Sequence, residues 1–305
     1  MTVCLISHPD CMLHEMGPLH PESPSRISAI QDQLVSSGLD QFLLHQDAPL
    51  ASREQLCRVH DGNYVDHIFH SSPIEGYSWL DPDTCMNPYS LSAALRAAGA
   101  VTLAVDLVIS EKCKSAFCNV RPPGHHAEHN NAMGFCMFNN IAVGVAHALH
   151  TQQIKKIAII DFDVHHGNGT EDIFKDTPEV LLCSSFQHPF YPNSGVNTES
   201  EHIINVPLPA GVDGKYFRSA VETYWLPRLE IFEPELIFIS AGFDAHIEDD
   251  MAGLCLVEED YAWITTKIKN IADKYSKGRI VSTLEGGYAL SALGRSVVAH
   301  IKALL

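Results

Sequence analysis

The sequence predicts an α/β fold: a mainly parallel sheet with helices on both of its faces. Short runs rich in β-branched residues alternate with longer segments whose apolar residues have helical spacing. Several of the short runs are almost wholly apolar, which is typical of strands covered on both faces. No Gly/Ser tract, charge block or internal repeat interrupts the alternation. We therefore expect residues 1–305 to form a single domain.

Residues 1–161 contain three expected strands and two expected helices. Val3–Ser7 reads Val-Cys-Leu-Ile-Ser and is the first strand. The Ala-rich stretch Ser90–Ile109 has the apolar spacing of a long helix, and the apolar run Ala116–Val120 follows it as a strand. Asn140–Thr151 is again helical in pattern and leads to Lys156–Asp161, whose Ile-Ala-Ile-Ile centre is typical of a buried strand. The order of strand and then helix favours a parallel sheet.

The C-terminal half repeats this order. Val180–Ser184 and Leu236–Ser240 are apolar runs of strand length, and the helical pattern Gly214–Ile231 separates them. The remaining expected elements are a helix, a strand and a final helix, over Glu258–Tyr275, Arg279–Leu284 and Ser291–Leu304. Each half of the chain thus contributes strands to one sheet.

Charge and cysteine content argue against several classes of protein. The chain has 20 Lys and Arg residues against 37 Asp and Glu residues, a formal net charge of −17. This charge disfavours direct nucleic-acid binding and favours cationic partners, although solubility alone explains it equally well. The nine cysteines are odd in number and form no Cys-x-x-Cys pair. With no signal-peptide pattern and no apolar run near the roughly 20 residues of a membrane span, we expect a cytoplasmic protein.

Polar motifs follow four of the expected strands at the point where each strand ends. They are Arg121-Pro-Pro-Gly-His-His126, Asp161-Phe-Asp-Val-His-His166, Asp244 and Glu285-Gly-Gly-Tyr288. Ligands of open parallel sheets bind beyond the carboxyl ends of the strands. We therefore expect these four loops to meet at one rim.

One of these motifs predicts a metal site. Asp163 and His165 are two residues apart, so on an extended segment their side chains point the same way, about 6.6 Å apart. With Asp244 as a third ligand, the set suits a catalytic zinc ion, which keeps one coordination position open. Asp161 would lie about 13 Å from His165 and is better placed as a supporting partner than as a ligand. Ordinary capping and turn formation is the alternative explanation for each motif taken singly.

Three further residues complete a hydrolytic set. His125 and His126 can supply a general base for water and an acid for a leaving group, and their candidate partners are Asp161 and Asn168. Tyr288 can donate a hydrogen bond to an oxygen on which negative charge develops. A structural turn explains the histidine pair, and an interior anchor explains the tyrosine, if each is considered alone.

Taken together, these motifs resemble the zinc-dependent histone deacetylase family and the related acetylpolyamine amidohydrolases. The likeness extends nearly from end to end, through His20–Arg26, Arg121–His126, Gly134–Asn140, Asp161–Thr170, Ser240–Asp244 and Leu284–Tyr288. It implies the arginase-deacetylase fold, with an eight-stranded, mainly parallel sheet. Asn168 in place of an aspartate, together with Tyr288 in place of a histidine, makes the chain similar to class II and bacterial members.

The resemblance also implies roles for single residues. Asp163, His165 and Asp244 would bind zinc, His126 would be the general base, and His125 would pair with Asp161. Tyr288 would polarise the acetyl carbonyl. The substrate would contact Gly134, Phe135, Tyr191 and Met251 along a tunnel and Asp83 at its rim, with Arg26 near an internal acetate cavity. The family also binds potassium, and the matching contacts are Asp161, Asp163, His165 and Ser184 for one ion and Phe174, Thr177 and Val180 for a second.

The expected function is hydrolysis of acetyl, or other acyl, groups from lysine side chains of proteins by metal-activated water. A second hypothesis keeps this chemistry and changes the substrate to an acylated polyamine or another small acylated amine. Met251, which is apolar where polyamine-selective relatives have a glutamate, disfavours one route to that preference. A third is a catalytically weak acyl-lysine binder, although a binder has no need of a base and an oxyanion donor. A two-manganese ureohydrolase would need further carboxylates that Asp161–His166 lacks.

Overall fold

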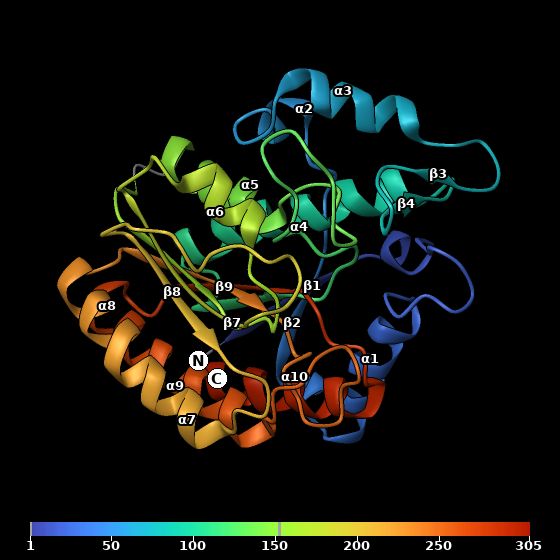
Figure 1. Ribbon diagram of the computed structural model, residues 1–305. Coiled ribbons are helices and arrows are strands. Elements are labelled where there is room, and N and C mark those ends of the chain that lie inside the picture. The colour runs from blue at the N-terminus through green and yellow to red at the C-terminus, as the bar shows by residue number, and fades with distance from the viewer. Residues whose placement is uncertain (1, 152–153) are drawn as a thin grey trace.

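The computed structural model describes residues 2–151 and 154–305, and its centre is one sheet of eight parallel strands (Figure 1). All seven strand pairings in this sheet are parallel. The spatial order is β2-β1-β5-β10-β9-β6-β7-β8. In chain order these strands are β1 Val3–Ser7, β2 Leu43–Asp47, β5 Ser115–Cys118, β6 Ile157–Asp161, β7 Val180–Gln187, β8 Ile203–Leu208, β9 Leu236–Ala241 and β10 Ile280–Leu284. A separate two-stranded ribbon pairs β3 Ser78–Trp79 with β4 Cys85–Met86.

Helices cover both faces of the sheet, as the sequence predicts. One layer contains α4 Ser90–Ile109, α5 Asn140–Thr151 and α6 Asn168–Phe174, with α2 Arg53–Leu56 and α3 Gly62–Ser71 beyond them (Figure 1). The other contains α1 Ser25–Ser36, α7 Gly214–Ala220, α8 Leu226–Phe232, α9 Glu258–Tyr275 and α10 Leu290–Leu304. Short 3-10 turns, η1 Pro9–Met12 and η2 Asp40–Phe42, and a π-helical turn, η3 Val221–Trp225, complete the described elements.

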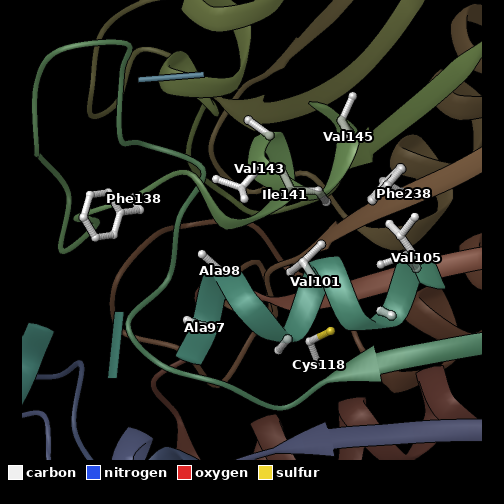
Figure 2. Close-up of a cluster of buried hydrophobic side chains, with 14 of the residues drawn as sticks. Ala97, Ala98, Val101, Val105, Cys118, Phe138, Ile141, Val143, Val145 and Phe238 are labelled. Atoms are coloured by element: carbon white, nitrogen blue, oxygen red, sulfur yellow. The ribbon is translucent and has the colours of Figure 1, made fainter. Parts of the chain in front are cut away.

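Each face of the sheet has its own apolar core, because successive side chains of a strand point to opposite faces. In β1, Cys4 and Ile6 belong to the core under α4 and α5, whereas Val3 and Leu5 belong to the core under α1 and α10. Figure 2 shows the first core, where small side chains of α4 let it approach α5 closely. The residues labelled there from these elements and from β9 are Ala97, Ala98, Val101, Val105, Ile141, Val143, Val145 and Phe238.

Most predicted helices and interior strands agree with the structure, whereas one helix is interrupted and the two edge strands were missed. Val3–Ser7, Ser90–Ile109, Asn140–Thr151 and Glu258–Tyr275 have the predicted bounds. The single helix expected over Gly214–Ile231 is instead α7, a π-helical turn and α8 in succession. The edge strands β2 and β8 were not predicted. Their exposed positions break the apolar run that marks a buried strand.

Helix α4 corrects one expectation about membrane spans. By length and composition it qualifies as a candidate, with a mean hydropathy of 1.6 over an 18-residue window, whereas the sequence analysis expected no such segment. Inside the molecule, 67% of that window is buried. Its apolar surface is therefore used for packing against β5, β10 and α5.

The register of the sheet places the polar motifs together. Asp161 at the end of β6 lies opposite Ser184 of β7 and Ser240 of β9, and Leu284 of β10 lies opposite Ala241 of β9. The strands thus end at one level, and the loops that follow them share a rim, as expected for a parallel sheet.

Candidate active site

A cavity of about 220 Å³ opens among the loops at this rim. Its wall is formed by residues of three of the four polar motifs, the exception being Asp244, and by residues of other loops. They are Asp83, Pro123, His125, His126, Gly134, Phe135, His165, Phe190, Tyr191, Met251, Gly286 and Tyr288. Of the predicted substrate contacts, Arg26 alone does not line this cavity.

The predicted metal ligands lie together at this site. One ligand atom from each of Asp163, His165 and Asp244 lies within 4.8 Å of the other two, and all three side chains are buried. His165 Nδ1 lies 3.1 Å from Asp163 Oδ1 and 3.3 Å from Asp244 Oδ2. The backbone fixes both carboxylates, because the amide of Gly286 donates to Asp163 Oδ2 and that of Val164 to Asp244 Oδ1.

This donor set fits a dication. Asp244 Oδ2 is buried and makes no hydrogen bond within the described residues. Burial alone would lower the pKa of His165, but the neighbouring Asp163 and Asp244 carboxylates outweigh burial and raise the pKa to about 10. Two buried carboxylates around one imidazole therefore favour a positive charge at this point. Two carboxylate oxygens and an imidazole nitrogen are ligand types of catalytic zinc sites.

The two histidines have different partners. His125 Nδ1 lies 3.0 Å from Asp161 Oδ2, and His126 Nδ1 lies 2.7 Å from the amide oxygen of Asn168. Burial by itself lowers the pKa of His125, but the charges of Asp163 and Asp161 outweigh it and raise the pKa well above the ordinary value.

Burial, helped by the charges of His125 and His165, lowers the pKa of His126 well below the ordinary value. The ring centroids of His125 and His126 are only 4.1 Å apart. The site therefore holds one imidazole that favours the cation beside one that favours the neutral base.

Tyr288 and Arg26 form one unit at the side of the cavity. The Arg26 guanidinium carbon lies 5.0 Å from the Tyr288 ring centroid, and Arg26 Nε donates to the carbonyl oxygen of Gly287 at 2.7 Å. Arg26 also donates to the carbonyl of Glu285 and to the Glu22 carboxylate. Arg26 is thus placed behind the tyrosine, where it holds the preceding loop.

The walls of the cavity are aromatic, as expected for a channel that accepts an aliphatic chain. Phe135 meets the Tyr288 ring edge to face, with centroids 6.2 Å apart, and Tyr191 meets His126 in the same way at 5.4 Å. Gly134 has a φ of +57°, and a side chain there would overlap the His126 ring. Asp83 also lines the cavity, and its Oδ1 accepts hydrogen bonds from the Gly134 amide and the Thr84 hydroxyl.

The candidate potassium contacts separate into two places. Ser184 is paired with Asp161 across β6 and β7, and its buried hydroxyl makes no hydrogen bond within the described residues. Phe174 and Thr177 instead line a groove with Arg58 and His150, beside α5 and α6. The Val180 amide donates to the Thr177 carbonyl at 3.0 Å, so Val180 lies beside that groove.

Three buried acids support the site and were not predicted as site residues. Glu22 pairs with Arg121 and Arg26, Glu285 accepts from the amides of Gly124 and His125, and Asp249 accepts from the amide of Tyr288. Burial raises the pKa of Glu285 to about 7 despite the nearby charge of His125. Glu22 and Glu285 lie within motifs that the sequence analysis singled out. Asp249 lies in the run Glu248-Asp249-Asp250, where no sequence signal separates it from its neighbours.

The parallel α/β sheet, with a buried Asp-His-Asp candidate metal set and a histidine pair at its carboxyl edge, is the arrangement of the arginase-deacetylase fold. The chain matches the histone deacetylase domain over residues 20–304. A protein of Synechocystis described as uncharacterized is 37% identical over 99% of both chains. A probable deacetylase of Archaeoglobus fulgidus is 34% identical over 95% of this chain and 82% of its own length.

A solved structure agrees with this assignment. The crystal structure of the HDA15 HD domain superposes with a TM-score of 0.94 at 34% identity, covering 99% of this chain and 88% of that one. The chain belongs to the histone deacetylase family.

Proposed function

We propose that the chain is a zinc-dependent amidohydrolase that removes acetyl groups, or other acyl groups, from lysine side chains of proteins. The observation that carries the proposal is the convergence of His126, Tyr288 and His165, a member of the buried candidate metal set, on one aromatic-walled cavity. Zinc held by Asp163, His165 and Asp244 would supply a Lewis acid that polarises the amide carbonyl and makes water more acidic. The family membership supports the reaction class.

The residues of the chain perform the remaining steps. The alkyl chain of the substrate lies between Phe135 and Tyr191, with the amide at the inner end beside His126. His126 takes the proton of the attacking water at Nε2, because Nδ1 is bonded to Asn168. Tyr288 donates its hydroxyl to the oxygen on which negative charge develops. The C–N bond then breaks, and the imidazolium of His126 returns its proton to the departing amine, which gives acetate and a free amine.

His125 has a different task in this scheme. Its hydrogen bond to Asp161 fixes the ring, and its positive charge faces the cavity beside His126. A cation at this point stabilises the anionic transition state and disfavours protonation of His126 before water attacks the amide carbonyl. The two histidines are therefore not interchangeable.

We also propose potassium near Asp161 and Ser184, with the unpartnered Ser184 hydroxyl oxygen as a contact. A second ion near Phe174, Thr177 and Val180 would rely on backbone oxygens. All nine cysteines are free thiols, which supports a reducing compartment such as the cytoplasm.

A second candidate substrate is an acylated polyamine, which would use the same chemistry. The apolar Met251 in the cavity wall favours the lysine substrate, because it offers no counter-charge to a second ammonium group. Side-by-side kcat/KM values for acetyl-lysine peptides and acetylspermidine test the choice, with zinc-loaded protein. We expect the peptides to be preferred; preference for acetylspermidine would reverse the assignment. Zinc-replete protein that binds the peptides and releases no acetate would instead indicate an acyl-lysine binder.

A further inference from the structure

Asp249 makes hydrogen bonds to two parts of the active site with one buried carboxylate. Its Oδ2 accepts from the backbone amides of Tyr288 and Ala289, at 2.6 and 3.0 Å. Its Oδ1 accepts from the backbone amide of Met251 at 3.0 Å. The side chain is 5% exposed, and it lies in the loop that follows β9, whereas Tyr288 lies in the loop that follows β10.

The segment that Asp249 holds has little stiffness of its own. Tyr288 follows two glycines, and Gly287 has a φ of +124°, a conformation that side-chain-bearing residues rarely adopt. Ala289 is the N-cap residue of α10, and its side chain cannot accept a hydrogen bond from the exposed helix amides. The Asp249 carboxylate accepts from the two amides that immediately precede the helix, those of Tyr288 and Ala289, and as an anion it suits the positive end of the helix.

Arg26 holds the same segment from the other side, through the carbonyl oxygens of Glu285 and Gly287. The peptide group between Gly287 and Tyr288 is thus held at its carbonyl oxygen by the Arg26 cation and at its amide by the Asp249 anion. Because the Tyr288 hydroxyl lies at the end of a long side chain, a small rotation of this backbone displaces the hydroxyl by a larger distance. Loss of either support would therefore move the hydroxyl away from the reacting oxygen.

We propose that Asp249 is a positioning residue that aims the Tyr288 hydroxyl at the reacting carbonyl and couples its position to Met251 in the channel wall. This inference rests on the proposed function, in which Tyr288 is the oxyanion donor. Asp249 itself does not line the cavity. Its effect is expected on kcat, because a misplaced donor weakens transition-state binding more than ground-state binding.

The test is a double-mutant cycle of Asp249→Asn and Tyr288→Phe, assayed with an acetyl-lysine peptide on zinc-loaded protein. Asn keeps the size of Asp, but its side-chain NH2 group replaces one carboxylate oxygen. That NH2 group, a donor, then faces either the Met251 amide or the amides of Tyr288 and Ala289, which are donors too. We expect kcat to fall by about 10- to 100-fold with KM changed by less than about 3-fold. In the Tyr288→Phe background, Asp249→Asn should cause almost no further loss, because the hydroxyl that it aims is already absent. Asp250→Asn is the matched control, since Asp250 is adjacent, has the same charge and is exposed.

Three results would overturn the proposal: losses that multiply in the double variant, unchanged kcat in Asp249→Asn, or an equal loss in Asp250→Asn. Circular dichroism and zinc content establish that each variant is folded and loaded. If Asp249→Asn does not fold, Asp249→Ser replaces it in the cycle, because its shorter hydroxyl can accept from only one part of the site. If Tyr288→Phe itself keeps full activity, the proposed function fails, and that outcome is distinct from failure of the cycle.

Discussion

Gly286 packs directly against the candidate metal ligands Asp163 and Asp244. Its amide donates to Asp163 Oδ2 at 2.8 Å, and its Cα faces the carboxylates of both Asp163 and Asp244. A methyl group at this position would overlap Asp244 Oδ2. Close packing against these two candidate ligands therefore requires a glycine at this position.

The first prediction is that Gly286→Ala lowers zinc affinity about 10- to 100-fold, because the methyl group displaces ligand carboxylates. The measurement is zinc binding in competition with a chromogenic chelator. Gly62→Ala is the control, because there the added methyl group would meet only the flexible end of Arg53. Unchanged zinc affinity in Gly286→Ala would show that the carboxylates are not the ligands.

Glu171 carries a pH-dependent part of the stability. It accepts hydrogen bonds from Thr198 at 2.6 Å and Asn205 at 2.7 Å and lies 2.9 Å from His166 Nε2, so it ties α6 to β8. Burial would raise the pKa of Glu171, but the bonds to His166, Thr198 and Asn205 outweigh it and lower the pKa from 4.5 to about 2. A carboxyl group with a depressed pKa in the folded state stabilises the fold above its unfolded pKa. That contribution is lost as the pH falls from about 4.5 to about 2.

We therefore expect Glu171→Gln to flatten the acid side of the stability profile. Between about pH 5 and about pH 3 the wild type should lose about 1–2 kcal/mol more unfolding free energy than the variant, after allowance for partial solvent screening. Urea unfolding at each pH measures the difference. Parallel profiles for the two proteins would contradict the assigned role of Glu171.

At the scale of elements, a buried ion network joins the segment before α1 to the loop after β5. Glu22, Arg26 and Arg121 are fully buried and pair with one another through Glu22. Arg121 also donates to the carbonyls of Cys11 and His14, at 2.8 and 3.0 Å. The N-terminal segment is therefore attached to the histidine loop by charge-assisted hydrogen bonds.

Glu22→Gln should destabilise the protein by about 3–5 kcal/mol, because two buried guanidinium groups lose their shared counter-charge. Equilibrium unfolding in urea provides the measurement. Glu54→Gln, which breaks the surface pair with Arg58, is the control and should cost less than about 1 kcal/mol. A similar small loss in both variants would mean that the buried network contributes little to stability.

The elements that sequence reasoning found are those whose burial is uniform. Interior strands such as β6 and β9 are buried at every position, so their apolar runs stand out. The edge strand β2 is buried only at its first residue, Leu43, and its sequence resembles a loop. The π-helical turn at Val221–Trp225 leaves no sequence signal that differs from a helix. The positions of edge strands and of helix irregularities depend on contacts with residues distant in sequence. Local sequence patterns carry no information about those contacts.

At the scale of the whole molecule, the meeting of four loops could be predicted because parallel strands place their carboxyl ends at one edge. This logic, with the resemblance, predicted the candidate metal set, the histidine pair and Tyr288, which the structure brings to one rim. It could not identify Asp249, because its partners, the amides of Met251, Tyr288 and Ala289, are backbone groups that any sequence supplies. It likewise could not show that Arg26 lies behind Tyr288 and outside the wall of the cavity.

The central claim is that this rim is a hydrolytic metal centre in which Tyr288 stabilises the oxyanion. The most direct measurement is acetate release from an acetyl-lysine peptide by zinc-loaded wild type and Tyr288→Phe, with Asp163→Ala as the blank. We predict steady release by the wild type, a kcat lower by about 100- to 1,000-fold in folded, zinc-loaded Tyr288→Phe, and no release above background in Asp163→Ala. Near-normal turnover by Tyr288→Phe, or by Asp163→Ala, would contradict the account.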